Sequence, residues 1–331
     1  MLWVYGKFKK MKKTIAFYQP HLDIQGTGVS NYDYAHFNQV ILGNKSYMIC
    51  DKDCKHTHPL AAEKFKESME VIELEGAQNM PLLEKKLEEL DVDAVYIQKC
   101  GKKDDGRFVN NKPMFIHAVG CENDPHGEVY AYVSEWLSQH SSNSEHPFIP
   151  YMLNLPNGSE DFRANLNIPE DATVFSRLGG HYGWDIPFVN EAIKEALRLR
   201  DDIYFIFAQT PQFLNHPRVI FVEPFANLKT KRKFINTADA MIHARGIGES
   251  FGMACAEYSF CNKPVITFEG SPERNHIATL KDKGVYYSNG MQLVNIFKDF
   301  RKEPQKDWNA YKDFSPEKVM AKFDQVFLSK I

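Results

Sequence analysis

Short apolar runs alternate with segments of helical periodicity along the chain. In the first half, runs rich in β-branched and aromatic residues predict strands at 14–18, 46–50, 94–98 and 114–119. Apolar residues at helical spacing predict helices at 30–42, 81–90 and 127–140. In the second half, the same patterns predict strands at 173–176, 204–208, 219–222, 240–243 and 264–268, and helices at 187–199, 228–238, 251–260, 291–300 and 316–328. This alternation is typical of an α/β protein with parallel sheets.

A break in the pattern divides the chain into two halves. The polar stretch 141–147 is followed by Pro150 and Pro156, and Asn157-Gly158 is a turn signal. We therefore predict two Rossmann-like domains, residues 12–148 and 149–315, that face a cleft at the carboxyl ends of their strands. Residues 1–11 are expected to be an N-terminal extension, and the amphipathic segment 316–331 a C-terminal helix.

Composition limits the partners of the protein. The 331 residues include 40 Lys and Arg against 43 Asp and Glu, a net charge of −3, which provides no general attraction for nucleic acid. No stretch reaches the roughly 20 apolar residues of a membrane span, and the first ten residues lack the apolar core of a signal peptide. We expect a cytoplasmic protein, with peripheral membrane contact left open.

Cysteine and histidine spacing predicts no metal site. The six cysteines are scattered, and the pair Cys50 and Cys54 has no second pair at zinc-binding spacing. We interpret the cysteines as reduced thiols. The basic run 229–233 lies on a predicted helix and is interpreted as a solvated face.

The most informative stretch runs from His243 to Thr267. A strand is expected to end near His243, a glycine-bearing loop follows, and we predict that Glu249 opens a helix that carries Glu257 about two turns later. Free backbone N–H groups from Ser250 to Met253 would seat a phosphate at the start of this helix, and Gly252 would permit close approach of the ligand. A diphosphate flanked by polyols would fit between the two glutamates.

This segment resembles the Glu, seven residues, Glu motif of retaining GT-B glycosyltransferases, in particular glycosyltransferase family 4. The resemblance implies that Glu249 contacts the hydroxyls of a donor sugar and that Glu257 binds the ribose of the nucleotide. The amides of the four residues between 250 and 253 would hold the diphosphate; these residues are Ser250, Phe251, Gly252 and Met253. Enzymes of this family generally work without a metal.

Further matches follow in the order expected from the family. Arg177, at the end of a predicted strand, corresponds to an arginine that neutralises the donor phosphates, and a guanidinium fork suits that role. The family usually carries a phosphate-binding lysine five or six residues later, where this chain has Tyr182 and Gly183. We hypothesise that Arg245 or His181 takes its place.

The first half supplies two further candidates. In the resembling family, a glycine-rich loop at this place approaches the donor phosphates from across the cleft. The resemblance implies this role for Gly26, Thr27 and Gly28, and glycine suits it because it accepts positive φ and exposes N–H groups. His117, at the end of an apolar strand, matches a family histidine near the reaction centre. The resemblance makes His117, Glu249 and Arg177 the candidate catalytic residues.

The resemblance implies transfer of a sugar from a nucleoside diphosphate sugar to an acceptor hydroxyl with retention of configuration, and no other cofactor. The first domain would be the acceptor side, the second would hold the donor, and the last helix would pack back on the first. The acceptor stays open among glycan, lipid and other hydroxyl compounds. The missing lysine favours one alternative, a nucleotide-binding protein without turnover. A sugar phosphorylase or a nucleotide-sugar epimerase of the same fold is another.

Overall fold

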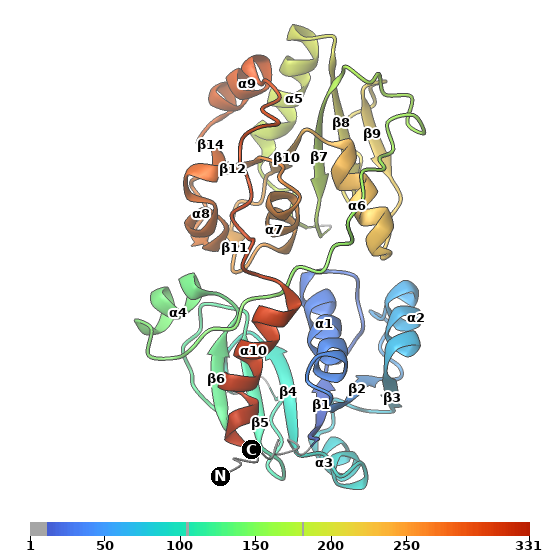
Figure 1. The fold of residues 1–331 in the computed structure, drawn as a ribbon, viewed down its shortest axis with the longest axis vertical. Helices are drawn as coiled ribbons and strands as arrows, with labels where there is room; N and C mark the ends of the chain where they lie inside the picture. Colours follow the sequence, from blue (N-terminus) through green and yellow to red (C-terminus); the bar gives the residue numbers. More distant parts are fainter. Residues whose placement is uncertain (1–11, 104–105, 181) are drawn as a thin grey trace, which may run out of the picture.

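The computed structural model describes residues 12–103, 106–180 and 182–331. The expected extension 1–11 and the candidate His181 lie outside the described residues. The described chain forms two lobes, each built on a six-stranded parallel sheet with helices on its faces (Figure 1). In the first lobe, strands β4 and β5 are buried at every position, as expected for a parallel sheet covered on both faces.

The first lobe has the strand order β3-β2-β1-β4-β5-β6. Its strands are β1 (Thr14–Tyr18), β2 (Lys45–Asp51), β3 (Glu70–Leu74), β4 (Ala94–Lys99), β5 (Met114–Ala118) and β6 (Val129–Tyr132). Its helices are α1 (Gly26–Val40), α2 (Pro59–Ser68), α3 (Met80–Glu89) and α4 (Glu135–Ser142). The order reverses between β1 and β4, so a crevice for a ligand is expected where these strands end.

The second lobe repeats this topology with the order β14-β12-β10-β7-β8-β9. Its strands are β7 (Thr173–Leu178), β8 (Ile203–Ala208), β9 (Val219–Val222), β10 (Ala240–His243), β12 (Val265–Phe268) and β14 (Gly284–Tyr287), and β11 (Gly248–Glu249) pairs with β13 (Glu273–Arg274) outside this sheet. Its helices are α5 (Pro187–Leu199), α6 (Leu228–Thr237), α7 (Met253–Phe260), α8 (Asn275–Leu280) and α9 (Gly290–Asp299). Here the order reverses between β7 and β10.

Helix α10 (Pro316–Val326) follows the second lobe in sequence but lies on the first (Figure 1). The ring of Phe323 stacks 5.2 Å from Tyr34, and the ring of Phe327, just beyond the helix, stacks 5.1 Å from Phe115. The two segments that cross between the lobes lie side by side, since the backbone N–H of Leu153 donates to the carbonyl of Phe314 at 2.8 Å.

The helix predicted at 127–140 is wrong in its first part. Residues 129–132 form β6, and α4 begins only after Ser134, whose hydroxyl accepts a hydrogen bond from the N–H of Leu137. The tyrosines of β6 are buried in the sheet, and this tertiary packing overrides the local helical pattern.

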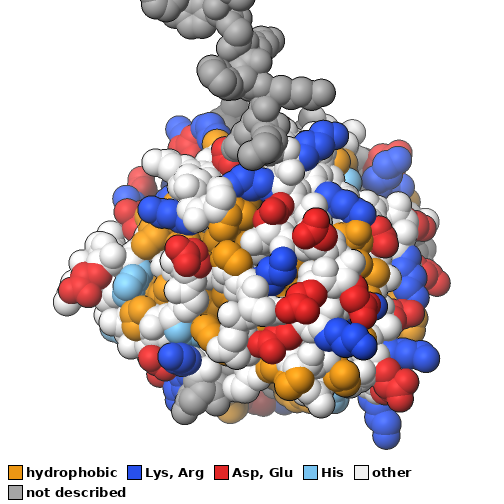
Figure 2. Space-filling model, turned by 90° about the horizontal axis from the view of Figure 1, so that it is seen from below, with side chains coloured by type: hydrophobic (Ala, Val, Ile, Leu, Met, Phe, Trp, Pro, Cys, Tyr) orange, Lys and Arg blue, Asp and Glu red, His pale blue; other side chains and the backbone are white. Residues whose placement is uncertain are grey.

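The surface shows little segregation of charge at the free end of the first lobe. Acidic and basic side chains are interspersed there, with small apolar patches between them (Figure 2). In the described residues, no helix is both long and apolar enough to cross a lipid bilayer.

Candidate functional site

A cleft of about 480 Å³ lies between the lobes, where strands of both sheets end. The first lobe lines it with the segment that follows β1 and with Val119, which follows β5. The second lobe lines it with the ends of β7 and β10, the loops that follow them, α6 and the start of α7. The lining residues used below are Arg177, Gly183, Lys231, His243, Arg245, Glu249, Ser250, Met253 and Glu257. The cleft thus lies at the switch points of both sheets, the expected place for a ligand.

The turn that precedes α7 differs from the prediction. Glu249 does not open the helix: it ends the short strand β11, and α7 begins at Met253. Gly252 stands between them as the N-cap with φ +86°, a left-handed conformation that favours glycine. The two glutamates therefore do not share a helix face. The turn brings Glu249 to the cleft beside the N–H groups of the first turn of α7, which have no partners within the helix.

Glu249 is held by two donors. Its Oε1 lies 3.0 Å from Nε2 of His243, and its Oε2 accepts from Nη1 of Arg245 at 2.9 Å. Burial raises the pKa of this carboxyl, but the hydrogen bond from His243 and the electrostatic attraction of His243 and Arg245 outweigh it, so the pKa is below its ordinary value. Glu249 is therefore a carboxylate at neutral pH, and each oxygen keeps a lone pair for a further donor.

A polar chain behind Glu249 orients His243. Nδ1 of His243 lies 2.8 Å from the hydroxyl of Thr267, which also lies 3.1 Å from Nε2 of His276. Burial lowers the pKa of His276 to about 3, so this ring is neutral. These contacts fit a chain in which His276 donates to Thr267 and Thr267 to His243, which leaves Nε2–H of His243 to donate to Glu249.

Arg177 is buried at the end of β7, and its guanidinium is held mainly by backbone carbonyls. Its guanidinium donates to the carbonyls of Gln209 at 3.1 Å and Gly180 at 2.6 Å, and to the hydroxyl of Thr210. Burial lowers its pKa to about 10, so it stays charged at neutral pH, although no carboxylate pairs with it among the described residues. A Cβ on Gly183 would lie 3.2 Å from Nη2, so glycine there lets the loop wrap the guanidinium.

Glu257 lies deeper in the cleft with a partner that the sequence interpretation missed. Its Oε1 accepts a hydrogen bond from Nζ of Lys231 at 2.7 Å, and both side chains are buried. Lys231 belongs to the basic run 229–233, so the prediction of a solvated face is wrong for this residue. Phe234 and Ile235 on the same helix are also buried, and this spacing was the signal that Lys231 faces inward.

The predicted glycine loop of the first lobe is the first turn of a helix. Gly26 and Gly28 belong to α1, and neither has a positive φ, contrary to the prediction. A Cβ on Gly28 would lie 2.4 Å from the carbonyl oxygen of Asp23, so glycine is needed for close packing there. Gly26 and Thr27 do line the cleft, at the N-terminus of α1.

The structure does not bring His117 to the cleft. The side chain is wholly buried in the first lobe, where Nδ1 lies 2.6 Å from the hydroxyl of Tyr96 and Nε2 lies 2.9 Å from the carbonyl of Ile149. Burial lowers its pKa to about 4. A carbonyl only accepts, so Nε2 carries the proton and Nδ1 accepts from Tyr96. His117 is a satisfied core residue.

The remaining candidates of the motif lie around the turn. Ser250 and Met253 line the cleft. The ring of Phe251 is buried and lies 4.8 Å from that of Tyr151.

Tyr182, at the position of the family lysine, is 88% exposed, and Arg245 lines the cleft while paired with Glu249. Among the described residues, no cluster of His, Cys, Asp or Glu could hold a metal ion.

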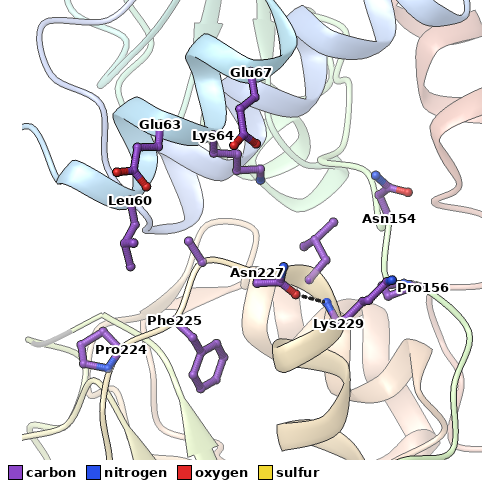
Figure 3. A pocket seen from close by; sticks show the side chains of 12 residues that line it. Leu60, Glu63, Lys64, Glu67, Asn154, Pro156, Pro224, Phe225, Asn227 and Lys229 are labelled. Carbon is purple, nitrogen blue, oxygen red and sulfur yellow. Dashed lines mark hydrogen bonds between the residues drawn. The ribbon is translucent and has the colours of Figure 1, made fainter.

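A wider groove of about 720 Å³ continues from the cleft along the seam between the lobes. Glu63, Lys64 and Glu67 line it from α2, and Phe225 and Asn227 line it from the segment that leads into α6 (Figure 3). A narrow pocket between them shares Lys64 and Phe225 with the groove, and Phe225 and Lys231 with the cleft.

The chain matches no protein-family model and no curated protein sequence. Solved structures with the same architecture are similar to it. A glycosyltransferase from Rickettsia africae is 16% identical in sequence and superposes with a TM-score of 0.69. The match covers 96% of this chain and 98% of the Rickettsia chain. HepE of Anabaena in complex with UDP-glucose is 13% identical, with 96% of both chains covered and a TM-score of 0.68. A protein from Listeria monocytogenes described as a UDP-N-acetylglucosamine 2-epimerase is 11% identical, with 96% and 98% covered and a TM-score of 0.65.

This chain has the GT-B fold. The predicted fold class, two Rossmann-like domains facing a cleft, is confirmed by the strand orders and by these neighbours.

Proposed function

We propose that this protein transfers a sugar from a nucleoside diphosphate sugar to an acceptor hydroxyl, with retention of configuration. The observation that carries the proposal is the position of Glu249 in the cleft. A partly buried carboxylate lies beside the free N–H groups of α7 and within the field of the buried Arg177 charge. Anion-binding groups next to a carboxylate suit a diphosphate bonded to a polyol.

The proposed reaction follows from these groups. The bond from the anomeric carbon to the diphosphate oxygen breaks, and the acceptor oxygen forms a bond to the same carbon on the same face. The acceptor proton passes to the departing phosphate oxygen. Arg177 and the N–H groups of α7 stabilise the negative charge that develops on the diphosphate. Glu249 accepts hydrogen bonds from the sugar hydroxyls, and Glu257 binds the ribose.

The neighbours support a nucleotide-sugar ligand through shared architecture. HepE was solved with UDP-glucose, and the Rickettsia africae protein is a glycosyltransferase. The first lobe would receive the acceptor, because its cleft-facing edge contributes few charges. Nothing in the lining selects among glycan, lipid and other acceptors.

The proposal is tested by measuring release of nucleoside diphosphate from UDP-, GDP- and ADP-sugars, with and without a panel of sugar and lipid acceptors. Acceptor-dependent release from one donor, with the anomeric configuration of the product preserved by NMR, is the expected result. No binding of any nucleoside diphosphate in calorimetry at millimolar concentration would overturn the proposal.

A second candidate is a nucleotide-sugar epimerase, which the Listeria monocytogenes neighbour favours. It would change the sugar without an acceptor. NMR of the donor sugar after incubation with the protein alone distinguishes the two, because an epimerised sugar appears only in the second case. Nucleotide binding with no change in any donor would indicate the non-catalytic alternative.

A further inference from the structure

Helix α1 carries a buried carboxyl group at the seam between the lobes. Asp33 is only 4% exposed, and among the described residues nothing forms a hydrogen bond or an ion pair with it. Val29, one turn earlier on the same face of α1, lines both the cleft and the narrow pocket beside it. Asp33 therefore lies on the face of α1 that meets the second lobe.

The charged groups around Asp33 have other partners. The ammonium group of Lys64 extends from α2 toward the seam and lies 3.9 Å from the centre of the Tyr32 ring (Figure 3). On the second lobe, Lys231 of α6 donates a hydrogen bond of 2.7 Å to Glu257 of α7. Lys64, Lys231 and Glu257 all act electrostatically on the carboxyl of Asp33, and two of the three belong to the second lobe.

A buried carboxyl without a hydrogen-bond donor favours its neutral form, because removing its charge from water carries a large desolvation cost. Burial raises the pKa of Asp33 to about 7, although the positive charges of Lys64 and Lys231 lower it, and the negative charge of Glu257 raises it further. With the lobes together, Asp33 thus retains a proton that a hydrated aspartic acid releases near pH 4.

The lobes are joined in a way that permits them to separate. Two chain segments cross between them side by side, where the N–H of Leu153 donates to the carbonyl of Phe314. Motion of one domain against another is the default for a chain of two domains. Separation along the groove would move Lys231 and Glu257 away from Asp33 and admit water to its carboxyl group.

We propose that Asp33 is a proton-linked latch: the lobes close with its carboxyl group protonated, and they separate more readily once it is ionised. A proton held only in the closed form favours closure at low pH, and this contribution is lost as the pH rises through about 7. The inference goes beyond the proposed function, because it concerns the closing of the cleft and needs no nucleotide.

Other titratable groups on α1 lie near the latch. His36 stacks on Tyr32 with ring centres 5.6 Å apart, and burial lowers its pKa. Burial raises the pKa of the phenols of Tyr32 and Tyr34, so both stay neutral at physiological pH. All three groups remain in an Asp33→Asn variant, so the difference between this variant and wild type isolates Asp33.

The test is small-angle X-ray scattering of the ligand-free protein, in which the distribution of distances gives the ratio of closed to open molecules. In wild type, this ratio should fall about 30-fold from about pH 5.5 to about pH 8.5, the linkage value for a pKa of about 7 in the closed form and about 4 in the open form. In Asp33→Asn, whose amide is neutral and of the same size, this fall should be lost.

Glu67→Gln is the matched control, because Glu67 lies on α2 and also lines the seam but is exposed (Figure 3). Its ratio should follow wild type. Lys64→Met provides a second variant should Asp33→Asn fail to fold as judged by circular dichroism. It removes a charge that lowers the pKa of Asp33, so the fall should move to higher pH.

A wild-type ratio that does not change with pH overturns the inference, and so does an unchanged fall in Asp33→Asn. An equal loss of the fall in Glu67→Gln also overturns it, because any negative charge at the seam would then have the same effect. All these measurements are made without nucleotide, so their failure leaves the proposed function to its own test.

Discussion

The two lobes meet the cleft with very different chemistry, although they share one topology. In the first lobe, the described residues that line the cleft are uncharged, among them Gln25, Thr27 and Val119. In the second lobe, the equivalent edge carries buried charges that approach the ligand space. The topology therefore fixes where a ligand can lie, and the side chains at the strand ends decide which lobe can act on it.

The largest expected effect is the loss of turnover in Glu249→Gln. The amide keeps the size of the side chain but removes the charge that the proposed function places against the donor sugar, so turnover should fall about 10²–10³-fold, the range for removal of one preorganised group. Nucleoside diphosphate affinity should change little. The assay is nucleotide release under saturating donor, with affinity measured by calorimetry.

Glu273→Gln is its control, because Glu273 also lines the cleft but is not bonded to His243 or Arg245. It should retain turnover within a few-fold of wild type. Equal losses in both variants would contradict the special role of Glu249.

Arg177→Lys should weaken nucleoside diphosphate binding about 10- to 100-fold. A lysine cannot reproduce the fork that bonds Gln209, Gly180 and Thr210, so the charge and both loops lose their positions. Arg218→Lys is a matched comparison, since Arg218 also donates to backbone carbonyls, those of Arg200 and Leu197, but does not line the cleft. Arg218→Lys should lower thermal stability and leave nucleotide affinity intact.

Two histidine variants compare the contributions of the two lobes to turnover and to stability. In His243→Phe, the hydrogen bond that lowers the pKa of Glu249 is lost, so that pKa should rise and the acidic limb of the pH–rate profile should move to higher pH. In His117→Phe, Tyr96 and Ile149 lose a partner, which should cost about 1–3 kcal/mol of stability. The pH–rate profile of His117→Phe should match wild type. A shift in both profiles would place His117 in the reaction after all.

The smallest effect concerns Asp33 at the seam. Burial raises its pKa to about 7, although Lys64 and Lys231 lower it. The folded state thus keeps a proton that the unfolded chain releases near pH 4, so this group makes stability fall as pH rises from about 4 to 7, by at most about 1.4 kcal/mol per pH unit. Asp33→Asn should flatten that slope in urea unfolding series.

Asp202→Asn should change the pH dependence of stability in the opposite direction, because the hydrogen bond from Arg200 lowers the pKa of Asp202. Its carboxylate stabilises the fold above pH 4, and that contribution disappears as the pH falls. A steeper slope in Asp33→Asn than in wild type would contradict the assignment at the seam.

The sequence predicted the regular elements better than the turns. Strand β10 and helix α5 have the predicted bounds, because long apolar runs and strong helical periodicity dominate locally. Strand β3 and helix α2 were missed, since charged residues interrupt their patterns. Gly252 adopts a left-handed conformation that takes Glu249 out of the helix, and a side chain there would crowd Glu249 and His276, the second of which comes from another helix.

The sequence predicted those residues of the candidate site that lie at strand ends, because it located the strands. Arg177, Glu249 and Glu257 follow strand ends that the pattern located, and they do line the cleft. The partners Lys231 and His276 come from other elements, so only the tertiary structure brings them close. The prediction failed for His117, which is buried in the core. Its position at a strand end did not reveal whether the side chain points to the cleft or into the core.

The return of α10 to the first lobe bears on the order in which the protein matures on the ribosome. Domains generally fold as they are synthesised, starting from the N-terminal one. Here the aromatic cluster around Tyr34 and Phe115 receives Phe323 and Phe327 only after the whole second lobe has been translated. The first lobe is thus made first, but its aromatic cluster is completed last.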